Sequence, residues 1–148
     1  MTSFNVLSRS LNVFGVHLLE ASAGTGKTFA IEHVIVRLLL EGLTIDQIVA
    51  MTFTRAAARE LKQRVRANLE NLLQSPNWDY FTHFVEAGRT QEAFRKVEAA
   101  LACFDEAQIF TIHGFCHRLL TEFAFEAKVS VHLPDPDDKG YKTVMREV

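Results

Sequence analysis

The sequence has few of the residues that define disulfide-rich, disordered or membrane-spanning proteins. Its 148 residues include only 2 Cys, 3 Pro and 7 Gly, which excludes a disulfide framework and a low-complexity chain. The N-terminus lacks the basic start and the apolar run of a secretory signal. The most apolar stretch, residues 34–43, contains Arg37 and Glu41 and is shorter than the roughly 20 residues of a membrane span. We therefore expect a cytoplasmic protein without a membrane role.

Neither sign of charge dominates the sequence. The 16 basic and 18 acidic residues give a formal net charge of −2, so no overall positive field attracts nucleic acid. Binding to nucleic acid would therefore require a local basic patch. With 48% hydrophobic residues over 148 positions, the chain is expected to fold around one hydrophobic core.

The first half of the chain has the pattern of a strand–helix–strand unit followed by a second helix. Residues 16–20 (V-H-L-L-E) form a short apolar run that predicts a strand, and the small residues after it predict a tight turn. Residues 27–40 are apolar on almost every side and predict a helix that ends at Gly42. Residues 48–53 alternate little, which is typical of a parallel strand covered on both faces. Residues 56–73 have strong helical periodicity.

The second half continues the alternation of helices and strands. Residues 78–104 are predicted to be helical overall, residues 109–112 to form a third strand, and residues 114–127 to form an amphipathic helix. Residues 128–148 contain a turn-rich acidic loop. The fold class predicted from this order is α/β, with a parallel sheet and flanking helices.

Residues 21–28 read A-S-A-G-T-G-K-T, which matches the phosphate-binding loop G-x-x-x-x-G-K-[ST] except at Ala21. Small residues let backbone N–H groups surround an anion, and the start of a helix favours negative charge. Lys27 would neutralise the β- and γ-phosphates of ATP, and Thr28 would bind Mg²⁺. The alternative, a simple turn with an exposed lysine, does not explain why a strand precedes and a helix follows this segment. The candidate nucleotide-binding residues are Ala21, Ser22, Ala23, Gly24, Thr25, Gly26, Lys27 and Thr28.

A second candidate site follows the predicted strand 48–53. Thr52, Phe53 and Thr54 stand where this strand should end, at the sheet edge where α/β proteins bind ligands. The next helix places four cations within a narrow wedge: Arg55, Arg59, Lys62 and Arg66. An aromatic ring beside a basic stripe is a common way to hold single-stranded nucleic acid. A solvated charged face is the alternative interpretation.

The third predicted strand is followed by a similar group of residues. Thr111, His113 and Phe115 lie where the strand turns into a helix and are further candidates for contact with DNA. Helix capping by Thr111 and His113 is the structural alternative. A metal site of His113, Cys116 and His117 is disfavoured because no second ligand pair accompanies them.

The D-E-A-Q sequence at residues 105–108 superficially matches a Mg²⁺-binding box. Such a box requires Asp at the end of a buried strand, whereas the preceding residues have helical periodicity and carry Arg95, Lys96 and Glu98. We interpret D-E-A-Q as a helix end without a catalytic role.

Three segments in this order resemble motifs I, Ia and Ib of UvrD/Rep-type superfamily 1 helicases, and in particular their RecB branch, the beta subunits of exodeoxyribonuclease V. They are L-L-E-A-S-A-G-T-G-K-T-F, I-V-A-M-T-F-T-R-A-A-A-R-E-L-K-Q-R-V and I-F-T-I-H-G-F-C-H-R-L-L, and the resemblance covers about residues 18 to 125. In this family an alanine at the position of Ala21 is common. The resemblance implies a RecA-like P-loop NTPase fold, with ATP–Mg²⁺ at Lys27 and Thr28. It also places Phe53, Thr54, Thr111 and His113 along the path of single-stranded DNA.

The same resemblance implies that the chain is the N-terminal part of helicase motor domain 1A. That part comprises a P-loop unit (16–73), a helical insertion (78–104), the motif Ib strand and helix (109–127) and an acidic end (128–148). The resemblance implies RecC- and RecD-like partner subunits, DNA repair and recombination as the role, and nuclease activity in the whole protein. Nothing in the sequence matches the Walker B carboxylates, the arginine finger, a second motor domain or a nuclease domain.

Three alternatives stay open at this stage. The chain could belong to another UvrD/Rep-type helicase, to a small P-loop phosphotransferase, or to a non-enzymatic module that binds nucleotide weakly. A phosphotransferase would require an arginine-rich lid and an acceptor-site acid after the second strand, and T-F-T-R-A-A supplies neither.

Overall fold

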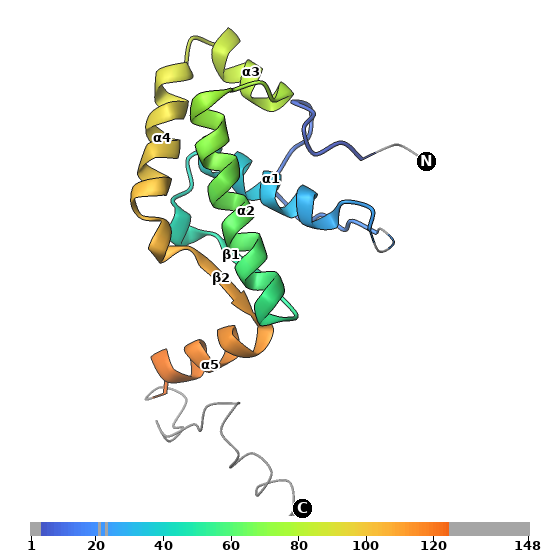
Figure 1. Cartoon of the computed structure of the whole chain (residues 1–148), viewed down its shortest axis with the longest axis vertical. Coiled ribbons are helices and arrows are strands. Elements are labelled where there is room, and N and C mark those ends of the chain that lie inside the picture. The colour runs from blue at the N-terminus through green and yellow to red at the C-terminus, as the bar shows by residue number, and fades with distance from the viewer. Residues whose placement is uncertain (1–3, 21, 23, 125–148) are drawn as a thin grey trace, which may run out of the picture.

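The computed structural model describes residues 4–20, 22 and 24–124 (Figure 1). Ala21, Ala23, the end of the predicted last helix and the predicted acidic loop lie outside the described residues. The elements are α1 (Lys27–Glu41), η1 (Ile45–Gln47), β1 (Val49–Thr52), α2 (Arg55–Gln74), α3 (Asp79–Glu86), α4 (Thr90–Ala102), η2 (Phe104–Glu106), β2 (Gln108–Thr111) and α5 (Ile112–Glu122). The fold of this part of the chain is α/β, as the sequence predicted.

The two strands pair in parallel, with Val49 opposite Gln108 and Thr52 opposite Thr111. Parallel neighbours need a long crossover, and here α2, α3 and α4 provide it. Helix α2 packs against both strands, whereas α5 extends from the end of β2 at the far end of the molecule (Figure 1). Because both strands run in the same direction, their carboxyl ends meet at one edge of the sheet.

The predicted strand at residues 16–20 is wrong for this structure, because these residues form no strand. Val16 is fully exposed, and Leu18 is 86% exposed. A strand needs a hydrogen-bonded neighbour, and within the described residues β1 and β2 pair only with each other. The apolar run therefore has strand composition but no partner strand.

Two glycines determine where helices end. Gly42 follows α1 with φ of +116° and donates its backbone N–H to the carbonyls of Leu38 and Leu39, which confirms the predicted helix end. The helical segment predicted at residues 78–104 is divided into α3 and α4. Gly88, with φ of +68°, lies between them and adopts a conformation that side-chain-bearing residues rarely adopt.

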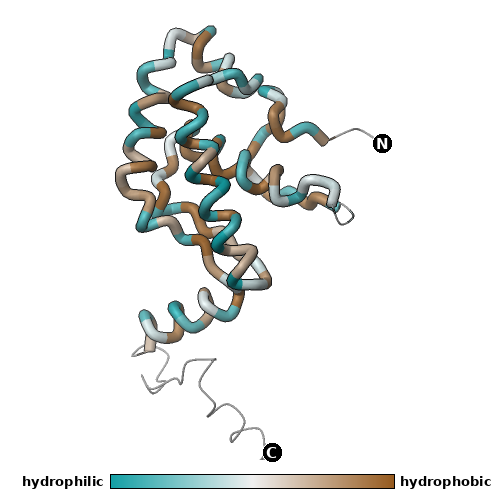
Figure 2. The backbone as a smooth tube through the Cα atoms, in the orientation of Figure 1, coloured by the Kyte–Doolittle hydropathy of each residue, from teal (hydrophilic) through white to brown (hydrophobic). Residues whose placement is uncertain are grey.

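The core is formed mainly by one face of each of the long helices. Along α2 the apolar residues recur at helical spacing among hydrophilic ones, as the alternating colours of Figure 2 show. The four main helices contribute these buried side chains to the hydrophobic cluster: Ile35, Val36, Leu39 and Leu40 from α1, Leu61, Val65, Leu69 and Leu72 from α2, Tyr80, Phe81 and Phe84 from α3, and Ala93, Val97 and Ala100 from α4. This helical core holds α1 in place and thereby positions the loop that precedes it.

Candidate functional site

The loop before α1, the candidate phosphate-binding loop, turns at two glycines with positive φ. Gly24 and Gly26 have φ of +77° and +89°, a conformation that favours glycine. Gly26 is the N-cap of α1, so the chain enters the helix directly from this turn. The first turn of α1 contains no acidic residue. The positive end of the helix dipole is therefore available to an anion.

The two chemically important side chains of this loop are exposed. Lys27 and Thr28 are the first two residues of α1 and both face solvent. The Lys27 ammonium donates to the carbonyl of Ser22 at 2.5 Å, and the Thr25 hydroxyl donates to the same oxygen at 2.7 Å. These bonds fold the loop back on itself over the start of the helix. Of the eight predicted nucleotide-binding residues, Ala21 and Ala23 lie outside the described residues.

The two threonine motifs meet at one edge of the sheet. Thr52 is the register partner of Thr111, so the segments that follow β1 and β2 start side by side. Phe53, directly after β1, is 82% exposed. His113 is also exposed, at the start of α5. The structure thus brings together the predicted DNA-contacting residues of both motifs, although the sequence separates them by about sixty positions.

Both strand-to-helix junctions use the same capping device. The Thr54 hydroxyl accepts the backbone N–H of Ala57 at 3.1 Å and caps α2. The Thr111 hydroxyl accepts the backbone N–H of Gly114 at 3.0 Å and caps α5. A Cβ atom at Gly114 would lie 3.1 Å from the Thr111 hydroxyl, so glycine fits closely there. The capping alternative for Thr111 is therefore confirmed, whereas His113 makes no side-chain cap bond in α5.

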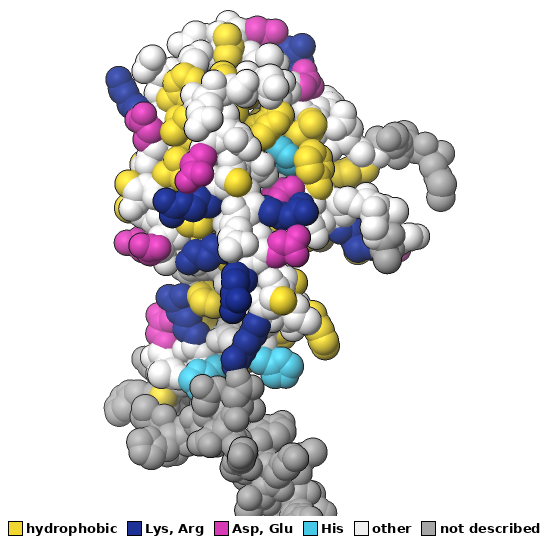
Figure 3. All heavy atoms as spheres, viewed as in Figure 1, with side chains coloured by type: hydrophobic (Ala, Val, Ile, Leu, Met, Phe, Trp, Pro, Cys, Tyr) yellow, Lys and Arg dark blue, Asp and Glu magenta, His cyan; other side chains and the backbone are white. Residues whose placement is uncertain are grey.

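The predicted basic stripe lies on the exposed side of α2. Figure 3 shows Lys and Arg side chains gathered along this helix, above the histidines of α5. Arg55 and Arg59 are exposed at its N-terminal end. The charged groups of Lys62 and Arg66 lie 5.8 Å and 5.6 Å from the centre of the Phe104 ring. The stripe therefore contains exposed cations near the sheet edge and cations that also pack on an aromatic ring further along.

Helix α5 leaves its apolar side chains largely uncovered, since none of its residues is buried. Phe115 is half-buried, and its ring centroid lies 6.2 Å from that of Phe110. Part of the Phe115 ring is therefore engaged in packing against β2.

Sequence reasoning missed a group of buried polar residues on α1. Glu32, His33 and Arg37 are 4%, 1% and 6% exposed. Charged and polar residues within an otherwise apolar helix were the signal that could have revealed them. Each has a partner from a distant part of the chain: Arg64 for Glu32 at 3.5 Å, Tyr80 for His33 at 3.0 Å, and backbone carbonyls of residues 6–11 for Arg37.

Burial shifts the pKa of each of these groups. It raises the pKa of Glu32, partly offset by the nearby Arg64 guanidinium, and it lowers the pKa of His33 to about 4. It also lowers the pKa of Arg37.

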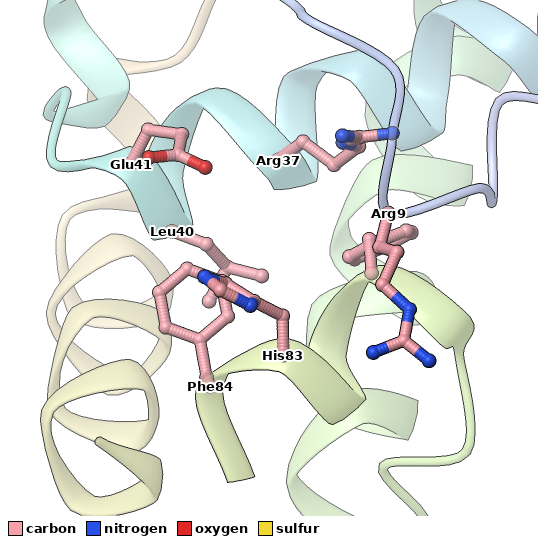
Figure 4. A pocket seen from close by; sticks show the side chains of 7 residues that line it. Arg9, Arg37, Leu40, Glu41, His83 and Phe84 are labelled. Carbon is pink, nitrogen blue, oxygen red and sulfur yellow. The ribbon is translucent and has the colours of Figure 1, made fainter. Parts of the chain in front are cut away.

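Figure 4 shows Arg9 and Arg37 near His83 and Phe84 of α3, around a cavity of about 30 Å³. This cavity is large enough for a water molecule and too small for a nucleotide, so Arg37 and its neighbours there have a structural role.

Asp105 and Glu106 of the D-E-A-Q segment are exposed in η2, directly after α4. They do not end a buried strand, in agreement with the interpretation of this segment as a helix end.

Among the described residues, no group of three or more His, Cys, Asp or Glu side chains is arranged to hold a metal ion. No described helix is long and apolar enough to cross a membrane.

Comparison with known proteins identifies the family. The model of the UvrD/REP helicase N-terminal domain matches residues 7–148. The RecBCD enzyme subunit RecB of Chlamydia trachomatis is 42% identical over 133 residues, which cover 82% of this chain and 13% of that protein. The RecB subunit of Escherichia coli K12 is 39% identical over 128 residues, covering 76% of this chain and 11% of the relative. The RecB subunit of Mycolicibacterium smegmatis is 41% identical over 109 residues, which cover 70% of this chain and 10% of that protein.

The chain thus spans only a small part of the length of the curated relatives that it matches. The glycine turn before α1, the two threonine-capped strand-to-helix junctions and the family match over nearly all of the chain agree with one another. This chain belongs to the UvrD/REP helicase family.

Proposed function

We propose that this chain is the ATP-binding N-terminal part of motor domain 1A in a RecB-type subunit, an ATP-dependent DNA helicase and exonuclease of double-strand break repair and recombination. The observation that supports this most directly is the turn at Gly24 and Gly26, which leads into α1 with Lys27 and Thr28 exposed. In this proposal residues 16–73 form the P-loop unit of a RecA-like sheet, 78–104 a helical insertion, 109–127 the motif Ib strand and helix, and 128–148 an acidic end.

The chemistry of the loop residues fits ATP with Mg²⁺. Backbone N–H groups at the start of α1 would surround the phosphates, which are also attracted by the helix dipole. The Lys27 ammonium would exchange the Ser22 carbonyl for phosphate oxygens and neutralise their charge. The Thr28 hydroxyl would contribute a ligand to the Mg²⁺ that accompanies ATP. Bound Mg²⁺ supplies charge neutralisation during phosphoryl transfer.

The sheet edge where β1 and β2 end, next to the threonine-capped starts of α2 and α5, fits a single strand of DNA. Exposed Phe53 would stack on a base, while Arg55, Arg59 and Lys62 would approach phosphates. Thr54, Thr111, His113 and Phe115 lie at the same edge or at the start of α5, where they would line the path of the strand. The relatives are named as subunits of a RecBCD enzyme, so we propose RecC- and RecD-like subunits as partners of the longer protein and the cytoplasm as its location.

Calorimetric titration with ATP and Mg²⁺ tests the nucleotide site. The test uses the chain and a chimaera in which residues 7–124 replace the aligned segment of the Chlamydia trachomatis relative. Lys27→Ala should abolish binding without altering the circular dichroism spectrum, because Lys27 is exposed and contributes nothing to the core. Arg95→Ala, an exposed cation on α4, serves as the matched control.

Binding by the chain without release of phosphate is the expected result, since the sequence has no match to the Walker B carboxylates or the arginine finger. Equal ATP affinity of the Lys27→Ala variant and the parent, in either protein, would contradict the proposed site. Loss of binding in the Arg95→Ala control would show that the effect is not specific to the loop.

A further inference from the structure

A buried carboxylate on α1 is paired with an arginine of α2. Glu32 lies in α1 and is 4% exposed. The Arg64 guanidinium reaches it from α2, with 3.5 Å between Arg64 Nη1 and Glu32 Oε1. A buried carboxylate without a counter-charge is strongly unfavourable, so the burial of Glu32 depends on Arg64. The contact therefore ties α2 to α1 at one defined point.

The same guanidinium contacts a second carboxylate at the surface. Arg64 Nε lies 3.0 Å from Glu60 Oε1, one turn earlier on α2. The Glu60 side chain is 61% exposed, whereas the Glu32 side chain is 5% exposed. An exposed ion pair within one helix contributes little to stability and leaves neighbouring helices unrestrained. The buried contact with Glu32 is therefore the one that restrains α1 relative to α2.

The two helices joined by this contact begin at the two proposed ligand sites. Helix α1 begins at the candidate phosphate-binding loop with Lys27, and α2 begins at the sheet edge next to exposed Phe53. The helices pack against each other and cross, so their N-terminal ends lie in different parts of the molecule (Figure 1). Glu32 is five residues after Lys27, which corresponds to about 7.5 Å along a helix axis. A displacement of α1 on nucleotide binding would thus reach α2 through the Glu32–Arg64 contact.

Apolar packing between these helices does not by itself specify one relative position. Both helices contribute leucine and valine side chains to the core, among them Val36 and Leu40 of α1 and Leu61 and Val65 of α2. Apolar contacts are not directional, so they tolerate small shifts of one helix along the other. A buried ion pair has a defined geometry, and fixing the register of helices is the best-supported role of such groups.

We propose that Glu32 and Arg64 are positioning residues that couple nucleotide binding at the loop before α1 to the binding of single-stranded DNA at the sheet edge. This inference rests on the proposed function, which supplies the two ligands. Neither side chain touches a ligand in this proposal, because Glu32 is buried between the helices and Arg64 acts through it. Coupling between two sites is reciprocal, so ATP should change the affinity for DNA by the same factor as DNA changes the affinity for ATP.

The coupling factor is the ratio of the DNA affinities measured with and without nucleotide. Fluorescence anisotropy of a labelled oligothymidylate, with Mg²⁺ and a non-hydrolysable ATP analogue or with Mg²⁺ alone, measures it in the chain and in the chimaera described above. We expect a factor of at least about five in the parent. Because the ratio compares each variant with itself, a change in surface charge at position 64 cancels.

Glu32→Gln and Arg64→Met should each bring the coupling factor to within about twofold of one, since coupling needs differential contacts that both variants remove. Glu60→Gln is the matched control, because it removes only the surface partner of the same guanidinium and should keep the parental factor. The double variant Glu32→Gln with Arg64→Met should lose no more coupling than either single variant. Losses that add in the double variant would show that the two residues act separately and would overturn the proposal.

A second double variant, Glu32→Met with Arg64→Met, separates positioning from stability. Apolar replacement of a buried ion pair often preserves stability, so this variant should unfold in urea close to the parental midpoint and still lack coupling. Parental coupling in any folded variant without the pair would overturn the proposal, and so would loss of coupling in Glu60→Gln.

The two affinities measured separately distinguish this inference from the proposed function. Failure of the parent to bind the ATP analogue or the oligonucleotide would refute the proposed function and this inference with it. Binding of both ligands without coupling, in the chain and in the chimaera, would overturn the inference alone. Where the parent shows coupling, its loss in Glu32→Gln and retention in Glu60→Gln would support the role of the buried pair.

Discussion

The imidazole Nδ1 of His33 lies 3.0 Å from the phenolic oxygen of Tyr80, which joins α1 to α3 inside the core. Both residues are almost completely buried. Burial lowers the pKa of His33 to about 4 and raises the pKa of Tyr80, so both side chains are neutral at pH 7. The bond connects the helix that begins at the candidate phosphate-binding loop to the helical segment 78–104.

The pKa of His33 predicts a loss of stability in mild acid. An unfolded chain has a histidine pKa near 6.5, whereas the folded value is about 4, so the unfolded state binds more protons between these values. The contribution of neutral His33 to stability is complete above pH 6.5. As the pH falls toward 4 it is lost, which lowers the free energy of unfolding by about 3 kcal/mol at most, because each unit of difference between the two pKa values corresponds to roughly 1.4 kcal/mol. Urea denaturation across this range measures it. His33→Gln should flatten the dependence, while exposed His83→Gln should not; identical profiles for all three proteins would contradict the prediction.

Arg37 is predicted to hold the N-terminal segment on α1. Its guanidinium donates to the carbonyls of Val6 at 2.9 Å and Ser8 at 2.8 Å, and also to that of Leu11. Arg37→Met should cost about 2–3 kcal/mol, because hydrogen bonds to a charged group contribute about 1.5–3 kcal/mol. Hydrogen exchange of residues 6–11 should accelerate.

Arg9→Met is the matched control for this change. Arg9 is about half-exposed, and its ion pairs with Asp79 and Glu86 are at the surface, so its removal should cost about 1 kcal/mol or less. A similar loss of stability in the two variants would show that the carbonyl contacts of Arg37 are unimportant.

The two threonine caps are predicted to contribute similarly to stability. Thr54→Ala and Thr111→Ala each remove the acceptor for a backbone N–H in the first turn of a helix. Each should lower the free energy of unfolding by about 1 kcal/mol, and Ser at either position should retain most of it. Denaturation midpoints measure the effect. If Ser is as destabilising as Ala, the hydroxyl is not the stabilising group.

The basic stripe on α2 is predicted to contact phosphates of single-stranded DNA. The double variant Arg59→Ala with Lys62→Ala should weaken binding of an oligonucleotide and reduce the slope of log K against log salt by about 1.4, at roughly 0.7 for each phosphate contact. Fluorescence anisotropy at several salt concentrations measures this. Arg95→Ala, on α4, should leave the slope unchanged. An unchanged slope in the double variant would favour the solvated-face interpretation.

The local elements were largely predictable from the sequence because their signals are local. The apolar residues of α2 recur at helical spacing, and α1 ends at Gly42 as predicted, with this glycine in the left-handed conformation. The turn of the candidate phosphate-binding loop likewise follows from its small residues, since Gly24 and Gly26 adopt positive φ values with little strain.

Only the tertiary structure decided the pairing of strands and the burial of charge. Residues 16–20 have the composition of a strand, but a strand exists only where another backbone segment pairs with it. The sequence showed polar residues at Glu32, His33 and Arg37, yet their burial is stable because Arg64, Tyr80 and the carbonyls of residues 6–11 reach them. The sequence by itself thus determined local geometry through short-range sterics and periodicity. Partners distant along the chain decided the rest, because hydrogen bonds and ion pairs need atoms that only the fold brings within reach.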